Sequence, residues 1–246
     1  MIFFLGAGPG DPELITLKGY RLLQEADLVV YAGSLVNEKV LEYTKPGTRL
    51  INSAHLNLEE IMSLMVEASQ KGDKVVRLHT GDPSLYGAIG EQMEVLLTQQ
   101  IPYQVVPGVS SFLAAAASLK KEYTVPDGTQ TLIITRLEGR TPVPDKEKLS
   151  SLAAHGASMA IFLSVGMIDQ VVKELLEVYA PDTPAAVVEK ASWPGEQIIQ
   201  GTLQDLAVKI KEAGIKKTAL ILVGNFLKNS GQSKLYDKEF THEYRG

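Results

Sequence analysis

The sequence contains no cysteine, which excludes disulfide bonds, thiolate metal ligands and cysteine nucleophiles. Histidine is scarce too: His55, His79, His155 and His242 show no HxH or HxxxH spacing, so we expect no metal site. No apolar run reaches the roughly 18 residues that a transmembrane helix needs. Because Met1 leads directly into a predicted strand, without the basic segment of a signal peptide, we expect a cytoplasmic protein with no membrane partner.

The chain also lacks an excess of positive charge. Its 24 Lys and Arg against 29 Asp and Glu give a net charge of −5, whereas surfaces that bind nucleic acid concentrate basic side chains. We therefore expect no nucleic-acid partner, and an anionic ligand must be held by a few local cations. The 246 residues, 45% of them hydrophobic, suffice for one large or two small globular domains.

What the sequence does have is a glycine-rich loop directly after its first apolar run. The residues Ile2 to Leu5 predict a buried strand, and the segment GAGPGDPELITLKG follows at Gly6 to Gly19. Three glycines within five residues leave backbone N–H groups uncovered, so a cofactor can approach the main chain closely. The alternative is a tight strand-to-helix turn without a ligand.

The details of this loop disfavour a dinucleotide as its ligand. The dinucleotide fingerprint needs a small residue at its sixth position, where this sequence has Asp11. Pro9 has no N–H to offer a pyrophosphate, and Pro12 delays the predicted helix until about Glu13. An NAD-dependent oxidoreductase is therefore kept only as an alternative.

The first half of the chain alternates short β-branched runs with amphipathic helical patterns, which predicts an α/β domain with a mostly parallel sheet. The predicted strands are Ile2 to Leu5, Leu28 to Tyr31, Leu50 to Ile51, Val75 to His79 and Tyr103 to Val106. The predicted helices are Leu14 to Ala26, Val36 to Tyr43, Leu58 to Lys71, Tyr86 to Gln99 and Ser110 to Leu119.

A weakly patterned segment at 120–130 is a predicted linker between a first domain at 1–119 and a second at 131–229. The predicted strands Ala185 to Glu189 and Gln197 to Gln200 are separated by too few residues for a helical crossover, so we expect an antiparallel hairpin and a mixed sheet. The predicted strands are Leu132 to Thr135, Met159 to Leu163, Ala185 to Glu189, Gln197 to Gln200 and Ala219 to Val223. The predicted helices are Lys146 to Ala154, Met167 to Val178 and Leu203 to Ala213, and residues 230–246 form a polar, extended or partner-docked tail.

Two further loops rich in Gly or Pro follow predicted strands of the first domain. Gly81-Asp82-Pro83 follows the strand that ends at His79, and Pro107-Gly108 follows the strand that ends at Val106. Ligands of open α/β sheets bind beyond the carboxyl ends of strands, so we expect the three loops to converge on one crevice. The Asp82 carboxylate then contacts a ligand directly or through a neighbour, unless it serves only an Asx turn.

Three motifs, GAGPGDPELITLKG at Gly6, HTGDPSLYG at His79 and VPGVSS at Val106, resemble those of the tetrapyrrole methylases. This family transfers methyl groups from S-adenosylmethionine during cobalamin and siroheme biosynthesis, and the likeness runs over nearly the whole chain. The segments GRTPVP at Gly139 and SKLYDK at Ser233 are similar to the branch that methylates C11 of precorrin-4 or cobalt-precorrin-4.

The resemblance implies a homodimer of chains with two α/β domains, S-adenosylmethionine bound in the cleft between the domains, and S-adenosylhomocysteine as product. Carried over by position, the cofactor contacts are Pro9, Thr80, Gly81, Asp82, Leu85, Ser110, Ser111, Leu163, Ala191 and Asn225. A polycarboxylated tetrapyrrole needs cations, for which the candidates are Arg77, His79, Arg136 and Arg140. Solvated surface arginines, or an ion pair of Arg136 with Glu138, are the alternative.

The implied chemistry needs no catalytic nucleophile, because the sulfonium methyl group is already activated and an electron-rich carbon attacks it. Ser110 and Ser111 do not fit the GxSxG nucleophile elbow, and we expect them to cap a helix and face the ligand. Other acceptors in the same fold, such as uroporphyrinogen III, ribosomal RNA or a modified histidine, remain as alternatives. A nucleotide-sensing module without turnover is the alternative from another class.

Overall fold

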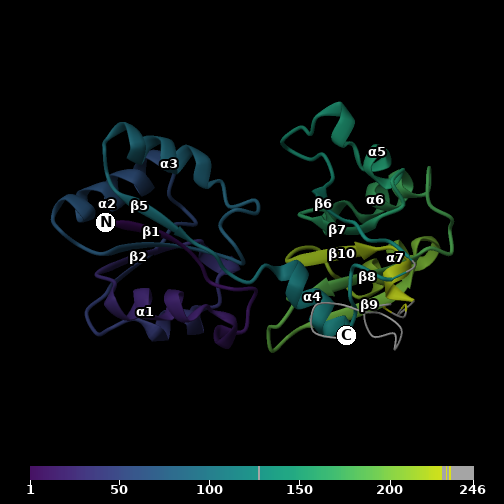
Figure 1. Cartoon of the computed structure of the whole chain (residues 1–246), viewed down its shortest axis with the longest axis horizontal. Coiled ribbons are helices and arrows are strands. Elements are labelled where there is room, and N and C mark those ends of the chain that lie inside the picture. Colours follow the sequence, from purple (N-terminus) through teal and green to yellow (C-terminus); the bar gives the residue numbers. More distant parts are fainter. Residues whose placement is uncertain (127, 229–230, 232, 234–246) are drawn as a thin grey trace, which may run out of the picture. The chain divides into compact units, whose positions relative to one another are not determined.

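The computed structural model describes residues 1–126, 128–228, 231 and 233, and the chain divides into two compact units (Figure 1). Unit 1 comprises Met1–Ala114 together with Ala191–Gly195. Unit 2 comprises Ala115–Lys190 and the chain from Glu196 onward. Apart from 231 and 233, the predicted tail at 230–246 lies outside the described residues. The domain limits drawn from the sequence, with their linker at 120–130, stay a prediction.

Unit 1 is built on a five-stranded parallel sheet with the strand order β3-β2-β4-β1-β5. Its strands are β1 (Ile2–Gly6), β2 (Leu28–Tyr31), β3 (Arg49–Asn52), β4 (Val75–His79) and β5 (Tyr103–Val106). The mostly parallel sheet expected from the alternating pattern is thereby confirmed. Since all five strands run in the same direction, the loops that follow them leave from one edge of the sheet.

Alternate residues of these strands pack on opposite faces of the sheet. Phe3 and Leu5 belong to the core under α1 (Leu17–Glu25), whereas Ile2 and Phe4 belong to the core under α2 (Leu58–Gln70) and α3 (Ile89–Thr98). Figure 1 shows α1 on one side of the sheet and α2 and α3 on the other. The helices therefore cover both faces of the sheet, and a ligand can approach it only at the ends of the strands.

Some helices predicted for unit 1 differ in the structure; α3, for example, begins at Ile89 and not at Tyr86. Asp11 caps a 3-10 turn, η1 (Pro12–Leu14), by accepting a hydrogen bond from the Glu13 N–H. Thr16 then caps α1 by accepting from the Gly19 N–H, so α1 begins at Leu17 and not at Leu14. The segment Val36 to Tyr43, predicted to be an α-helix, contains instead the 3-10 element η3 (Glu38–Tyr43), and another 3-10 element, η2 (Gly33–Leu35), precedes it.

Unit 2 is built on a mixed five-stranded sheet with the order β6-β7-β10-β8-β9. Its strands are β6 (Leu132–Arg136), β7 (Ser158–Phe162), β8 (Pro184–Glu189), β9 (Gln197–Thr202) and β10 (Ala219–Val223). Strands β6 and β7 are parallel, whereas β10 is antiparallel to both β7 and β8. Strands β8 and β9 pair antiparallel along their whole length, which confirms the predicted hairpin and the mixed sheet.

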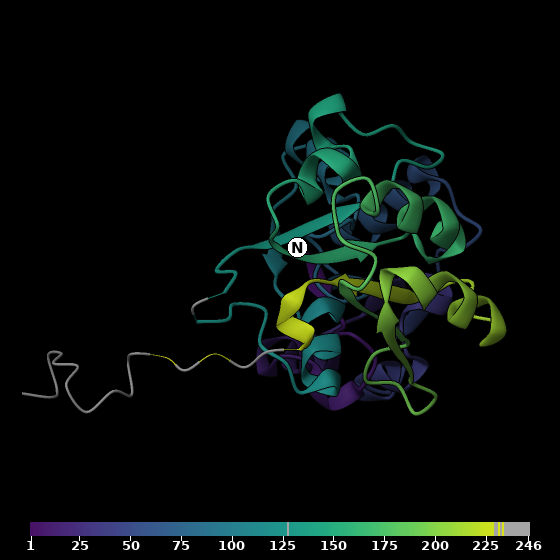
Figure 2. The ribbon, with the colours of Figure 1, turned by 90° about the vertical axis from the view of Figure 1, so that its right-hand side faces the viewer.

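One face of this second sheet is covered by three helices (Figure 2). They are α5 (Leu149–Ala153), α6 (Ile168–Leu175) and α7 (Leu203–Glu212). The helix α4 (Ser111–Leu119) joins the two units, and 3-10 turns stand at η4 (Asp145–Glu147), η5 (Val165–Met167) and η6 (Asn225–Leu227). Within the residues described, no helix has the length and apolar character needed to cross a membrane.

Candidate functional site

The loops after β1, β4 and β5 meet at the carboxyl edge of the first sheet. We call these segments, Ala7–Asp11, Thr80–Ala88 and 107–110, the three-loop cluster. The Ala7 N–H donates to the His79 carbonyl at 2.7 Å, and the Gly81 N–H donates to the Gly8 carbonyl at 2.8 Å. These bonds continue the pairing of β1 with β4 beyond the strands. The Gly108 N–H of the third loop donates to the Asp82 carboxylate of the second, so the three loops meet as expected.

Two glycines, Gly6 at the end of β1 and Gly108 in the third loop, are required because the backbones here touch. A Cβ at Gly6 would lie 2.5 Å from the Gly81 carbonyl oxygen, and a Cβ at Gly108 would lie 2.2 Å from the same oxygen. Real Cβ atoms essentially never approach backbone so closely, and the loops would have to separate to admit one. The glycines therefore set how tightly the three loops pack together.

Asp82 joins the second loop to the third. Its Oδ1 accepts hydrogen bonds from the Ser84 N–H at 2.8 Å and from the Ser84 hydroxyl, and its Oδ2 accepts from the Gly108 N–H at 2.9 Å. Partial burial by itself raises the pKa of the Asp82 carboxyl, but the hydrogen bonds from Ser84 and Gly108 outweigh burial and lower the pKa. Asp82 is therefore a carboxylate at neutral pH, with both oxygens engaged by the protein.

The first loop differs from the expectation that its glycines leave backbone N–H groups uncovered. Residues 2–10 are all buried. The Ala7 N–H donates to the last residue of β4, the Gly8 N–H donates to Gly81 of the second loop, and the Asp11 N–H donates to the Ser192 hydroxyl at 3.0 Å. The side chain of Trp193 lies against Gly10. The more accessible residues around the cluster are Thr80, which is exposed, and Leu85 and Ser111, which are half-buried.

The second loop holds two residues in an unusual backbone conformation. Tyr86 and Ala88 have positive φ angles of 56° and 48°, a region in which a residue other than glycine costs about 1–3 kcal/mol. Such strain persists only where the surrounding structure enforces it, and it concentrates at ligand sites. The Gln92 amide holds this segment by donating to the Ala88 carbonyl at 3.1 Å.

Ser110 is buried and its carbonyl accepts the first hydrogen bonds of α4, from Leu113 and Ala114. This is the position of a helix N-cap residue, as expected for this serine. Its neighbour Ser111 is half-buried and begins α4. Both serines stand where the third loop of the cluster turns into the helix.

Arg77 and His79 lie inside unit 1, which removes them from the candidates for carboxylate binding. Arg77 is 6% exposed, and its guanidinium donates to the Val30 carbonyl at 3.3 Å and the Ser53 hydroxyl at 3.0 Å. Burial lowers its pKa to about 10, so it stays charged. His79 is 4% exposed, and burial, with a smaller contribution from Arg77, lowers its pKa to about 3. His79 is therefore neutral at physiological pH and offers no positive charge.

Arg136 is used partly by its own loop. It ends β6, and its guanidinium donates to the carbonyls of Leu137, Thr141 and Pro142 at 3.3, 3.1 and 2.9 Å. These bonds hold the Gly139–Pro144 turn, leaving Arg136 half-buried. Arg140, in the same turn, is exposed. Of the two arginines, it is therefore the one whose guanidinium is accessible to a ligand.

Leu163 follows β7 in a strained and exposed conformation. Its φ is +56° and its side chain is 67% exposed, an unfavourable combination for a leucine. The next residue, Ser164, is held in place by two hydrogen bonds. Its hydroxyl accepts from the Leu137 N–H at 2.8 Å and donates to the Phe162 carbonyl at 2.6 Å. An exposed apolar side chain held under strain fits the apolar ligand contact expected of Leu163.

The sheet topology brings most of the predicted residues of the second half to one end. Strands β6, β7 and β8 run in the same direction, so Arg136, Leu163 and the chain leading from β8 to Ala191 leave from the same edge. Lys190 and Thr218, beside each other there through a 2.8 Å hydrogen bond, also have positive φ angles, of 49° and 55°. Ala191 itself is buried and belongs to unit 1.

Asn225 lies at the opposite end of that sheet. It follows β10, whose last residue Val223 pairs with Met159 near the start of β7. Leu163 follows the other end of β7, and a strand of its five residues spans about 16 Å. The antiparallel pairing of β7 with β10, which the sequence does not reveal, therefore separates Asn225 from Leu163. We leave Asn225 out of the cofactor site proposed below.

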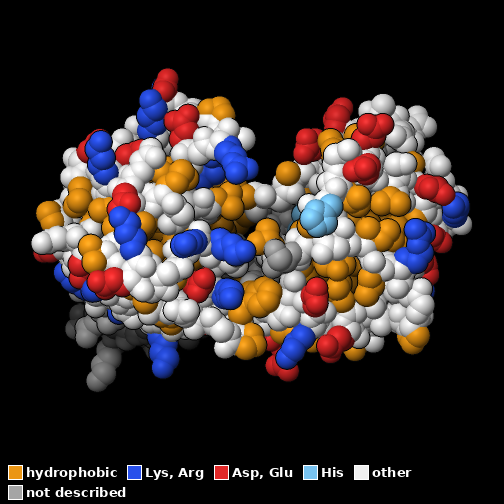
Figure 3. Space-filling view, turned by 180° about the vertical axis from the view of Figure 1, so that it is seen from behind, with side chains coloured by type: hydrophobic (Ala, Val, Ile, Leu, Met, Phe, Trp, Pro, Cys, Tyr) orange, Lys and Arg blue, Asp and Glu red, His pale blue; other side chains and the backbone are white. Residues whose placement is uncertain are grey.

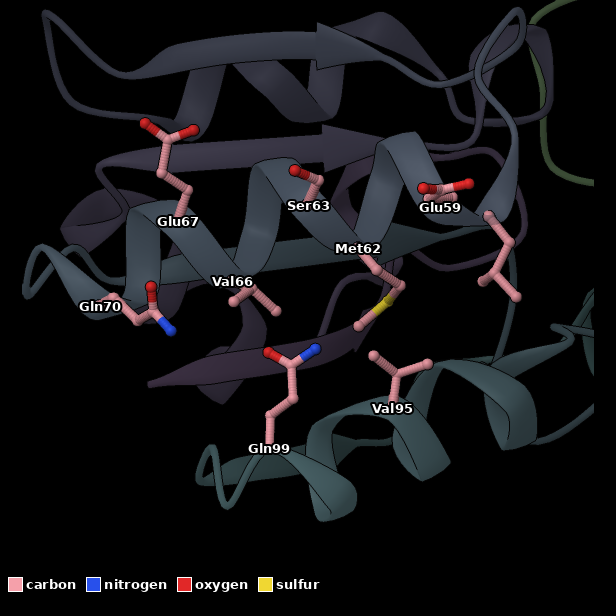
Figure 4. Close-up of a pocket in the computed structure, with 9 residues that line it drawn as sticks. Glu59, Met62, Ser63, Val66, Glu67, Gln70, Val95 and Gln99 are labelled. Atoms are coloured by element: carbon pink, nitrogen blue, oxygen red, sulfur yellow. The ribbon is translucent and has the colours of Figure 1, made fainter.

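The described residues contain two open hollows, neither of which is lined by a residue of the three-loop cluster. One, of about 630 Å³, lies between α2 and α3, with Met62, Val66 and Val95 on its walls (Figure 4). Its charged lining residues are Glu59 and Glu67, which do not suit an anionic ligand. The other, of about 640 Å³, surrounds Asn225 in unit 2 and contains neither Lys nor Arg.

Charged side chains are otherwise dispersed. On the face shown in Figure 3, basic side chains stand among acidic and apolar ones in each unit. Within the described part of the chain, no group of three or more His, Asp or Glu side chains has the arrangement needed to hold a metal ion.

Sequence reasoning named Ala191 as a cofactor contact but missed that its segment, Ala191–Gly195, packs with the three-loop cluster. Its Ser192 and Trp193 contact the glycine-rich loop, although about 180 residues separate them from it in the chain. The available signal was the chain's one tryptophan, placed in the Ser-Trp-Pro-Gly turn of a predicted hairpin. A large aromatic residue in a short hairpin turn indicates contact with another part of the structure.

Comparison with known proteins agrees with the family resemblance seen in the sequence motifs. The family model of the tetrapyrrole (corrin/porphyrin) methylases matches residues 1–207. The chain is 60% identical over 247 aligned residues to a cobalt-precorrin-4 C(11)-methyltransferase of Methanocaldococcus jannaschii, an alignment covering 99% of this chain and 95% of that protein.

Two solved structures are similar in fold. The X-ray structure of a cobalamin biosynthetic enzyme, cobalt precorrin-4 methyltransferase, has a TM-score of 0.91 at 48% identity and covers 93% of this chain and 96% of that one. Uroporphyrin-III C-methyltransferase from Thermus thermophilus, complexed with S-adenosylhomocysteine, has a TM-score of 0.77 at 33% identity, covering 92% and 98%. The match of the family model to most of the chain and the agreement in fold lead to one conclusion: the chain belongs to the tetrapyrrole methylases.

Proposed function

We propose that this chain is the S-adenosylmethionine-dependent methyltransferase that methylates C11 of precorrin-4 or cobalt-precorrin-4 in cobalamin biosynthesis. The observation that carries this proposal is the 60% identity, over 99% of the chain, to a cobalt-precorrin-4 C(11)-methyltransferase. The uroporphyrin-III enzyme is a more distant relative at 33% identity, and no feature of the described site favours its substrate.

The methyl donor is proposed to bind at the three-loop cluster. The cluster suits a nucleoside without phosphates, because α1 begins at Leu17, well after the glycine-rich loop, and so offers no helix N-terminus to a pyrophosphate. The proposed contacts are Pro9, Thr80, Gly81, Asp82, Leu85, Ser110 and Ser111, with Ala191 and Leu163 as apolar contacts. Of these, Asp82 acts by shaping the loops, since its two oxygens already accept protein hydrogen bonds.

The reaction depends more on the alignment of methyl donor and acceptor than on acid–base catalysis. S-adenosylmethionine supplies a methyl group on a positively charged sulfur. A carbon of the tetrapyrrole attacks this methyl group as the S–CH3 bond breaks, and the sulfur leaves as neutral S-adenosylhomocysteine. The protein's part is to hold donor and acceptor in line and to exclude water. Good orientation alone lowers a barrier by about 7–11 kcal/mol. A site of packed backbone, without a side-chain nucleophile, is adequate for this task.

The tetrapyrrole is proposed to be held through its carboxylates by Arg140, with Arg136 fixing the turn that presents it. A guanidinium binds a carboxylate through two parallel hydrogen bonds. Arg77 and His79, which were candidates from the sequence, are assigned structural roles inside unit 1. No residue is assigned as a general base.

The assembly and location follow the resemblance: we propose a homodimer in the cytoplasm. Light scattering after size-exclusion chromatography tests the assembly. The expected mass is twice that of the 26.7 kDa chain, and the mass of a single chain would contradict it.

Thermal unfolding with added ligand is the first test of the proposed function. A ligand that binds the native state raises stability by about 2.7 kcal/mol at a concentration of 100 times its dissociation constant. S-adenosylhomocysteine should therefore raise the melting temperature by several degrees, whereas NAD should leave it unchanged. A rise with NAD alone would contradict the proposal and favour an oxidoreductase.

The decisive test is methyl transfer itself. Purified protein with S-adenosylmethionine is supplied with precorrin-4, cobalt-precorrin-4 or uroporphyrinogen III, and the products are analysed by mass spectrometry and by NMR of the labelled methyl carbon. One added methyl group at C11 of either precorrin-4 form is expected, and the faster form identifies the native substrate. Methylation of uroporphyrinogen III alone would overturn the assignment.

A further inference from the structure

The segment Ala191–Gly195 lies between β8 and β9 of the second sheet in sequence but packs with unit 1. Two hydrogen bonds attach it to the glycine-rich loop. The indole N–H of Trp193 donates to the Pro9 carbonyl at 2.9 Å, and the Ser192 hydroxyl accepts from the Asp11 N–H at 3.0 Å. The attachment points stand on either side of Gly10.

The ring of Trp193 also occupies the space that a side chain at position 10 would need. A Cβ at Gly10 would lie 2.0 Å from Cδ1 and 2.2 Å from Nε1 of the indole. The φ of Gly10 is not in the left-handed region, so the backbone itself would accept alanine. Glycine is required here because the indole lies directly against the main chain.

Other contacts fix the same loop and the same segment. The Asn37 amide donates to the Gly10 carbonyl at 2.8 Å from the other side of the loop. Ser192 has a φ of +68°, a conformation that costs a residue other than glycine about 1–3 kcal/mol. This turn at Ser192 determines where its neighbour Ala191, a proposed cofactor contact, is placed.

We propose that Trp193 and Ser192 are positioning residues that hold Pro9–Asp11 and Ala191 in the shape that binds S-adenosylmethionine. The proposal rests on the assignment of the three-loop cluster as the cofactor site. A loop ordered before binding loses less conformational entropy when the ligand arrives, and affinity rises accordingly. Neither residue takes part in the transfer, so their loss should raise the dissociation constant and KM of the cofactor and leave kcat at saturation nearly unchanged.

The test uses Trp193→Ala and Trp193→Phe in the full chain, with S-adenosylhomocysteine as the calorimetric probe. Trp193→Ala should raise the dissociation constant at least tenfold and change kcat at saturating S-adenosylmethionine by less than about threefold. Trp193→Phe keeps a ring but loses the N–H donor, and its affinity should lie between those of the other two proteins. Melting temperatures without ligand establish that each variant is folded.

Gly10→Ala approaches the same contact from the other side. It should weaken binding as much as Trp193→Ala, and the double variant should be no weaker than Trp193→Ala, because the clash disappears with the ring. Gly195→Ala, in the same segment with no atom within 4 Å of its Cβ, is the matched control and should bind normally. Trp193 is the chain's one tryptophan, so Gly10→Ala should also shift the fluorescence emission to longer wavelength as the ring moves into water.

The outcomes distinguish this inference from the proposed function. If the wild-type chain does not bind S-adenosylhomocysteine, the cofactor site is wrong. If the wild type binds but Trp193→Ala and Gly10→Ala bind as tightly as it does, the positioning role alone is overturned. Should Trp193→Ala not fold, Trp193→Phe is combined with Gly10→Ala and the affinity for S-adenosylhomocysteine is measured. Losses of affinity that do not add support the contact, and losses that add overturn the positioning role.

Discussion

Asp82 shows how a residue that resembles a ligand contact in the sequence acts through its neighbours in the structure. Both of its carboxylate oxygens accept hydrogen bonds, from Ser84 within the second loop and from Gly108 in the third. The bond to Gly108 joins two segments that are far apart in sequence. Removing the carboxylate would leave the Gly108 N–H without its acceptor and free the third loop to shift.

We predict that Asp82→Ala weakens S-adenosylhomocysteine binding at least tenfold, which corresponds to about 1.4 kcal/mol. Isothermal titration calorimetry at pH 7 measures this. Ser84→Ala is the matched control, because it removes one hydroxyl donor and keeps the Gly108 bond, and it should cost less than about threefold. An unchanged affinity in folded Asp82→Ala would show that the carboxylate does not shape the site.

Asp82 should also affect the free energy of unfolding, and the pH dependence of this contribution follows from the lowered pKa of its carboxyl. A carboxyl with a folded-state pKa below its unfolded value contributes stability at every pH above that unfolded value, about 3.9. The contribution is lost as the pH falls through the lower, folded-state pKa. The difference in unfolding free energy between wild type and Asp82→Ala should therefore stay constant from pH 7 to 5 and shrink only in stronger acid.

The role of a residue could be predicted where a sequence motif determines the backbone conformation. It could not be predicted where the role depends on whether the side chain is buried. The glycines at 6, 81 and 108 were read from the sequence as loop residues, and they do meet. Arg77 and His79 stand on a strand whose every residue is buried, but a charged residue in a short strand gives no sign of which face it takes. The hydrogen-bond partners of Arg77, which are Ser53 and Gln92, lie elsewhere in the chain, and no local pattern contains that pairing.

At the level of elements, the turn after β6 is organised by the strand's own last residue. Arg136 donates to three carbonyls of the following segment, and the turn presents Arg140 to solvent. The two arginines, equal candidates in the sequence, are thereby given different tasks. One shapes the turn, and the other is available for a carboxylate.

We predict that Arg140→Ala weakens binding of the tetrapyrrole about tenfold or more, because a charged hydrogen bond contributes about 1.5–3 kcal/mol. Affinity for S-adenosylhomocysteine should not change. Arg140→Lys keeps the charge without the planar fork and should be intermediate, and Arg49→Ala, an exposed arginine on the edge strand β3, is the surface control. Equal loss of cofactor and tetrapyrrole affinity would mean that Arg140 supports the fold and not the substrate.

The strands were predictable to within a residue or two because alternation and β-branching mark them directly. Helix starts were less so: the N-cap of α1 is Thr16, and nothing local distinguishes it from Asp11, which caps only a 3-10 turn. The end of the sheet at which Asn225 lies depends on β10 inserting between β7 and β8. That insertion is a matter of tertiary pairing, for which the sequence of one strand carries no signal.

At the level of the whole molecule, each unit has its own core. The two faces of the first sheet and the helix-covered face of the second are packed by separate sets of buried side chains. The segment Ala191–Gly195 is an exception to division by sequence, because it belongs to unit 1 while its flanking strands belong to unit 2. A division drawn from composition cannot assign such a segment, since its contacts are made with residues near the N-terminus.

Hydrogen exchange with and without S-adenosylhomocysteine tests the whole distribution of proposed contacts at once. Ligand binding suppresses the local openings of the segments it touches, by up to about a hundredfold when bound at 100 times its dissociation constant. Protection is expected at 7–11, 80–88, 107–111 and 190–195, measured by mass spectrometry of peptides, and at 162–164 in unit 2. Residues 154–158 and 223–227, at the Asn225 end of the second sheet, should exchange unchanged and so serve as the internal control. Protection of 223–227 equal to that of the three loops would restore Asn225 to the site and contradict the placement argued from β10.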